Sequence, residues 1–177
     1  MNPAGARAGV LCAALAAPAA QAFDHTRAGD VLENALPASV AAMELWRQDR
    51  EGLWQFGMSF TATWLATQAL KQGLDVRRPD GGVESFPSGH AAKAFAAATY
   101  VHRRHGWDSA WPWYAAGAYV GWTRVNANRH RWIDIAGSLG LAAVSSGWLV
   151  EPLADKGVTV LPVIAPGHAS LTLQARW

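Results

Sequence analysis

Apolar and polar residues alternate with helical spacing over most of this chain. In five segments the apolar positions recur every three or four residues, the period of a helix with a buried face. These segments are residues 38–49, 52–72, 88–105, 109–125 and 129–150. A polar loop rich in Gly and Pro, residues 74–87, separates the second helix from the third. The pattern predicts an all-α fold, a compact helical bundle of about five helices.

Local signals place two helix ends. Pro37 and Ser39 stand near the start of the first helix, where a proline loses no hydrogen bond. Gly73 follows the second helix, as glycine often does at a helix end. We therefore expect the first helix to begin at residue 38.

The C-terminal tail has a different period. Residues 168–177 alternate apolar and polar side chains, which is strand periodicity, and the β-branched run at 157–164 precedes them. Pro166 and Gly167 can turn between the two runs. The pattern predicts a short C-terminal β-hairpin tail over residues 158–177.

The N-terminus has the three parts of an export signal. Arg7 supplies the positive start, a short apolar stretch follows, and Ala20 to Ala22 provides small residues before Phe23. We expect a signal peptide over residues 1–22 and a mature helical domain over 23–157, exported to the periplasm. The alternative is an N-terminal helix that is retained. The single cysteine, Cys12, lies inside the leader, so the mature chain would hold no thiol.

Composition narrows the class of partner. The 177 residues suit one domain, and a net charge of +2 without a basic stripe gives no reason to expect nucleic acid. Several apolar stretches could indicate transmembrane helices. Each, however, is shorter than the roughly 20 apolar residues that a transmembrane helix needs, or includes Gln55, Gln68 or Asp134. Tryptophans could instead form a belt at a membrane surface. We favour a domain that is soluble or rests against a membrane over an integral one.

The third helix begins with residues that could bind an anion and transfer a proton. Ser88, Gly89 and His90 occupy its first turn, where backbone N–H groups lack partners and favour an anion. The plain alternative is that Ser88 only caps the helix and His90 is a surface residue. The rest of the chain has to decide between them.

Three cations and a second histidine favour an anion-binding site over a simple helix cap. A small helical core does not bury Lys71, Arg78 and Arg124 without an anion. His130 and Asp134 are four residues apart, hence on one face if that stretch is helical. A carboxylate there can fix the imidazole tautomer and leave the other ring nitrogen to attack. Singly, each residue also fits a solvent-exposed or capping role, but together they form a phosphate cage with two histidines.

The joint pattern resembles the type 2 phosphatidic acid phosphatase and vanadium haloperoxidase superfamily. Its three parts, in order and spacing, are Lys71 with Arg78-Pro79, Pro87-Ser88-Gly89-His90, and Arg124 with His130 and Asp134. One departure is Thr123, where the family more often has serine, although a hydroxyl is retained.

The resemblance implies roles for these residues. His130 would attack phosphorus and form a phosphohistidine, Asp134 would hold its imidazole, and His90 would protonate the leaving oxygen. The phosphate oxygens would be bound by Lys71, Arg78, Ser88, Gly89 and Arg124. The expected activity is hydrolysis of phosphate monoesters or pyrophosphates, on a small molecule or a lipid, with no metal and no cofactor. The alternative is a vanadate-dependent haloperoxidase, although the members of that class are much larger. The sequence makes no prediction about oligomeric state.

Overall fold

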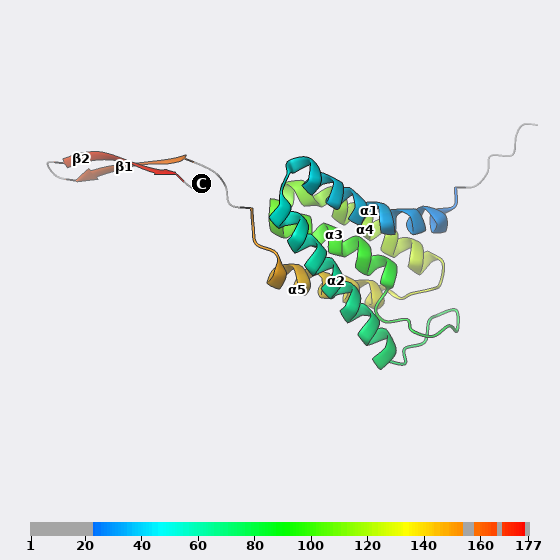
Figure 1. Cartoon of the computed structure of the whole chain (residues 1–177). Helices are drawn as coiled ribbons and strands as arrows, with labels where there is room; N and C mark the ends of the chain where they lie inside the picture. Colours follow the sequence, from blue (N-terminus) through cyan, green and yellow to red (C-terminus); the bar gives the residue numbers. More distant parts are fainter. Residues whose placement is uncertain (1–22, 154–157, 166–167, 176–177) are drawn as a thin grey trace, which may run out of the picture.

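Five helices form the body of the protein (Figure 1). The structure, a computed structural model, describes residues 23–153, 158–165 and 168–175. The helices are α1 (His25–Arg47), α2 (Arg50–Gly73), α3 (Gly89–His105), α4 (Trp107–Asn126) and α5 (Trp132–Leu149). The predicted bundle of about five helices is therefore confirmed.

Two strands follow the helical body along the chain. They are β1 (Val158–Ala165) and β2 (His168–Ala175), which pair antiparallel with Val158 opposite Ala175. Pro166 and Gly167, the predicted turn, lie outside the described residues, as do residues 154–157. The hairpin tail therefore stays a prediction. The predicted signal peptide, residues 1–22, also lies outside the described part of the chain.

Helix α3 is the centre of the bundle and contacts each of the other four helices. It is rich in alanine, and its buried small residues let the neighbouring backbones come close. The buried alanines are Ala91, Ala92, Ala94, Ala96, Ala97 and Ala98. Larger side chains such as Tyr100 and Val120 complete the core around it. Because α3 is surrounded, its N-terminus is held in a fixed place.

The first helix is longer than the pattern predicted. It begins at His25 rather than at residue 38, because the Asp24 side chain caps it by accepting from the N–H of Arg27 at 3.0 Å. Pro37 lies inside the helix instead of at its start. A proline there removes one intrahelical hydrogen bond, and the packing of α1 along α3 and α4 outweighs that loss. The interpretation of Pro37 as a helix start was wrong. As a result, the first three turns of α1 were not predicted.

The last helix is shorter than predicted at its N-terminal end. It begins at Trp132, so His130 lies in the loop before it and Arg131 is the capping residue. The predicted helix start at residue 129 was therefore wrong, and the condition for a shared helix face is not met at His130, although the His130 and Asp134 side chains still lie close together. Among the described residues no helix is both long enough and apolar enough to cross a membrane.

Two glycines of α5 give a paired test of the packing that carries the site. A Cβ on Gly137 would lie 2.4 Å from the Phe86 ring, which belongs to the loop before α3, whereas one on Gly140 would meet nothing within 4 Å. We expect Gly137→Ala to lower the free energy of unfolding by about 1–3 kcal/mol through overpacking. Gly140→Ala should raise it by up to about 1 kcal/mol, because alanine favours a helix. Urea unfolding of both variants measures the difference, and equal effects would contradict the close contact.

Candidate active site

The predicted residues gather at one end of the bundle, where α2 ends and α3 and α5 begin. Lys71 lies in the last turn of α2, and Arg78 in the loop that follows it. Ser88 is the capping residue of α3, and its side chain accepts from the N–H of Ala91. His130 ends the loop between α4 and α5.

His130 and Asp134 form a buried pair. The His130 Nδ1 atom lies 3.4 Å from Asp134 Oδ2, and neither side chain has more than 5% of its surface exposed. The alignment does not make this contact a hydrogen bond, and Nδ1 has no partner among the described residues. The Asp134 carboxylate therefore faces one ring nitrogen of His130, as predicted. His130 reaches this position from the loop before α5, not from the helix itself.

Asp134 is held in place from two sides. The Ser85 hydroxyl donates to Asp134 Oδ2 at 2.6 Å, and the backbone N–H of Arg131 donates to the same oxygen at 2.9 Å. Asp134 is the third residue of α5, so the second bond is the carboxylate half of a capping arrangement. Ser85 is fully buried. Sequence reasoning missed it, and the only signal available was its place two residues before Pro87.

The starts of α3 and α5 are joined directly. The N–H of Ser88 donates to the Asp134 carbonyl at 3.2 Å. The Ser138 hydroxyl lies 2.8 Å from both the Ser88 carbonyl and the Asp134 carbonyl. The predicted phosphate-binding turn at Ser88 and Gly89 is thereby fixed next to the His130 pair.

Lys71 and Arg78 supply positive charge beside this pair. Lys71 Nζ donates to the Glu84 carbonyl at 2.6 Å. A Cβ on Gly89 would lie 3.8 Å from Lys71 Cε, so the lysine stem passes the first turn of α3. The Arg78 Nε atom is buried without a hydrogen-bond partner among the described residues. Such an orphan donor next to a buried histidine suits a ligand with anionic oxygens.

The electrostatics keep His130 neutral. Burial lowers the pKa of the His130 ring to about 4, the charges of Lys71 and Arg78 act in the same direction, and Asp134 opposes them. Burial also lowers the pKa of Lys71, and the nearby Arg78 lowers it further. At neutral pH His130 is therefore an unprotonated imidazole, the form that can act as a nucleophile.

Arg124 and His90 form a second group with residues that the sequence did not point to. Arg124 Nη1 donates to Asp30 Oδ1 at 2.7 Å, and His90 Nε2 lies 3.0 Å from the same oxygen. His90 Nδ1 lies 3.4 Å from Glu33 Oε2. Asp30 and Glu33 lie in the part of α1 that Pro37 hid, so only the structure reveals them. The predicted clamp is thus divided between two neighbouring groups.

The described residues offer little for a metal ion. Within that part of the chain no three His, Cys, Asp or Glu side chains gather closely enough to hold one. The described groups of the site are cations, backbone N–H groups, two imidazoles and the carboxylates of Asp134, Asp30 and Glu33.

A comparison with protein families matches the site as a unit. The model described as the PAP2 superfamily matches residues 63–155, more than half of the chain, and this range contains all eight predicted site residues. The chain belongs to the PAP2 superfamily. The resemblance drawn from the three-part signature is therefore confirmed.

Curated relatives and a solved structure agree with the family. The lipid A 4'-phosphatase of Helicobacter pylori is 32% identical over 124 residues, which are 63% of this chain and 62% of that protein. The lipid A 1-phosphatase of Porphyromonas gingivalis is 37% identical over 84 residues, 43% of this chain and 18% of that protein. The chain thus spans less than two thirds of the length of either relative. The crystal structure of Aquifex aeolicus LpxE has the same fold, with a TM-score of 0.51 and 18% identity over 66% of this chain and 82% of that one. The haloperoxidase alternative is not favoured, because both relatives are named as phosphatases.

The lowered pKa of His130 predicts a pH dependence of stability. The folded ring binds its proton near pH 4, whereas an unfolded histidine does so near 6.5. Between these values the unfolded chain binds more protons, so His130 costs stability as pH falls from 6.5 toward 4. We expect His130→Asn to reduce, by roughly 2 kcal/mol, the loss of unfolding free energy between pH 7 and pH 4.5.

Urea unfolding at the two pH values measures this effect. His102→Asn is the matched control and should lose stability as the wild type does, because that side chain is exposed at the far end of α3. An identical pH dependence in the His130 variant and the wild type would contradict the assignment of a buried neutral ring.

Proposed function

We propose that this protein is a phosphatase that cleaves phosphate esters through a phosphohistidine at His130. The observation that carries the proposal is the buried, neutral His130 ring beside Asp134, with Lys71 and Arg78 close enough to shift its pKa. Membership of the PAP2 superfamily and the names of the two relatives support the same chemistry.

The reaction proceeds in two displacements. His130 Nε2 attacks phosphorus, a P–N bond forms, and the P–O bond to the leaving group breaks while His90 gives a proton to the leaving oxygen. Asp134 stabilises the positive charge that develops on the His130 ring. Water then attacks the phosphohistidine with His90 as base, the P–N bond breaks, and phosphate is released.

The clamp makes a metal unnecessary in this proposal. Lys71, Arg78 and Arg124 neutralise the phosphate oxygens, and Ser88 and the N–H of Gly89 bind them at the start of α3. Arginine can make paired contacts to phosphate, which adds orientation to charge. No cofactor enters either step.

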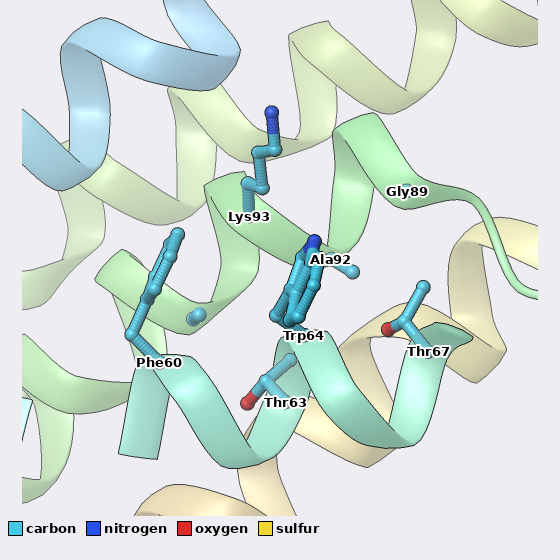
Figure 2. Close-up of a pocket in the computed structure, with 8 residues that line it drawn as sticks. Phe60, Thr63, Trp64, Thr67, Gly89, Ala92 and Lys93 are labelled. Carbon is cyan, nitrogen blue, oxygen red and sulfur yellow. The ribbon is translucent and has the colours of Figure 1, made fainter. Parts of the chain in front are cut away.

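The substrate we propose is a phosphate carried by a lipid of the lipid A class. Beyond the names of the relatives, apolar side chains next to the site support this. Trp132 and Ile133 open α5 with 57% and 64% of their surfaces exposed, directly after the His130 loop. A narrow crevice with a volume of only about 10 Å³ lies between α2 and α3. Figure 2 shows Phe60 and Trp64 on its α2 side and Gly89 at one end.

Export and a membrane-facing position complete the proposal. A periplasmic location rests on the leader pattern of residues 1–22, and contact with a membrane surface rests on the exposed apolar side chains around the site. At a membrane surface facing the periplasm, the proposed enzyme would meet a phosphate carried by a lipid.

The covalent intermediate is the direct test of mechanism. In excess chelator, we expect the wild type to hydrolyse an aryl phosphate and to show a phosphoenzyme that is labile in acid and stable in base. His130→Ala should lose both, by at least roughly a thousandfold in kcat, because nothing replaces the nucleophile. Quenched-flow mass spectrometry detects the intermediate.

Two controls make that result specific. His102→Ala should keep full activity, since that ring lies at the other end of α3. Activity in a folded His130→Ala protein would rule out the phosphohistidine. Loss of wild-type activity in chelator with recovery on added magnesium would rule out the metal-free clamp.

A second test concerns the substrate. We expect Trp132→Ser to reduce kcat/KM for lipid A in micelles about tenfold, because an exposed tryptophan at the site mouth would contact the lipid. The same variant should act normally on a water-soluble aryl phosphate. Trp148→Ser, at the opposite end of α5 and 86% exposed, is the control. Equal loss on both substrates would contradict a lipid-contacting role for Trp132.

A further inference from the structure

A carboxylate of α1 occupies the donors that a phosphate would need. The Asp30 Oδ1 atom receives the Nη1 donor of Arg124 at 2.7 Å and lies 3.0 Å from His90 Nε2. Burial acts to raise the pKa of Asp30, but the hydrogen bonds and charges of Arg124 and His90 together hold that pKa below its ordinary value. Asp30 is therefore an anion with one oxygen between a guanidinium and an imidazole.

Arg124 itself is fixed in place. Only 1% of its side-chain surface is exposed, and it also donates to the Thr26 carbonyl at 2.6 Å and to Thr123 Oγ1 at 3.0 Å. The approach of α1 to α4 at this point is close, because a Cβ on Gly29 would lie 2.3 Å from Thr123 Oγ1. If the ion pair between Arg124 and Asp30 opens, Asp30 is therefore the residue that must move.

Asp30 is the partner that can move. About half of its side-chain surface, 51%, is exposed, so the carboxylate can rotate into water. The buried Arg124 guanidinium then keeps the Thr26 carbonyl and Thr123 Oγ1 as partners, and it needs a second anion in place of the carboxylate. Glu33, by contrast, is only 12% exposed and lies 3.5 Å from Lys93 Nζ. When Asp30 leaves Nε2 of His90, Glu33 still faces Nδ1 of the same ring.

We propose that Asp30 is a place-holding anion that the phosphate of the substrate displaces from Arg124 and His90. The inference rests on the proposed function, which assigns phosphate binding to Arg124 and proton transfer to His90. A phosphate that takes the Arg124 Nη1 and His90 Nε2 contacts now made by Asp30 must displace the carboxylate, so each substrate molecule competes with Asp30 on binding. The released phosphate meets the same competitor, which favours its departure after each turnover.

The test is the affinity for inorganic phosphate, measured by calorimetry on the full chain. Asp30→Asn keeps the shape but removes the charge, and we expect its Kd for phosphate to fall about tenfold or more. A hydrogen bond between charged groups changes an equilibrium constant by at least that factor. The KM for an aryl phosphate should fall in parallel. Asp30→Ser serves as a second variant with the same expected direction.

A matched control separates displacement from a change in net charge. Asp108→Asn removes one carboxylate from an exposed position in the first turn of α4, at the end of the bundle remote from the start of α3, and should leave the Kd unchanged. If phosphate binds the Asp30 variants no more tightly than wild type, or more weakly, Asp30 is a permanent partner of Arg124 and the proposal is wrong. Unfolding of both variants would also overturn it, because the carboxylate would then be structural.

The two hypotheses fail in different ways. A wild type that neither binds phosphate nor hydrolyses an aryl phosphate would overturn the proposed function, and this inference with it. A wild type that does both, with Asp30 variants of unchanged affinity, would overturn the inference alone.

Discussion

The buried carboxylate of Asp134 is the contact on which the rest of the site depends. A charge removed from water in the interior of a protein is costly unless hydrogen-bond donors compensate for the lost water. Here the Ser85 hydroxyl and the Arg131 N–H both donate to Asp134 Oδ2, whereas Oδ1 has no hydrogen-bond partner among the described residues. The backbone carbonyl of Asp134 also receives the N–H of Ser88. One residue thereby ties the loop before α3, the start of α3 and the start of α5 into one unit. The position of His130 follows from that unit.

The two carboxylate–histidine contacts of the site differ in character. Asp134 is buried and multiply bonded, so its position relative to His130 is fixed. Asp30 is half exposed and contacts Arg124 and His90, so its position relative to His90 can change. A fixed contact would suit the proposed role of His130 as a nucleophile aligned with phosphorus. A labile contact would suit the proposed role of His90 as an acid whose ring is free when the substrate arrives.

The motif residues chosen from the sequence lie close together in the structure, whereas the predicted starts of the first and last helices were wrong. The cations, the Ser88 turn and the His130–Asp134 spacing are local motifs, and their residue types and spacing are visible in the chain itself. Pro37 misled because a proline at a helix start and one tolerated inside a packed helix look the same without tertiary contacts. Asp30, Glu33 and Ser85 were out of reach for a related reason. Their partners lie dozens of residues away, and only the packing of α1 and α5 around α3 brings them together.

The central position of α3 has a mechanical consequence for the enzyme. The helices that carry Arg124 and Asp134 touch each other little, and each rests mainly on α3. The distance between Arg124 and Asp134 is therefore set largely by the thickness of α3, and the loop through His130 joins α4 to α5. Alanines make that spacer as thin as a helix with side chains can be. One methyl group added to a buried alanine in the middle of α3 would push α4 and α5 apart. It would thereby change the distance between Arg124 and Asp134 without altering either residue.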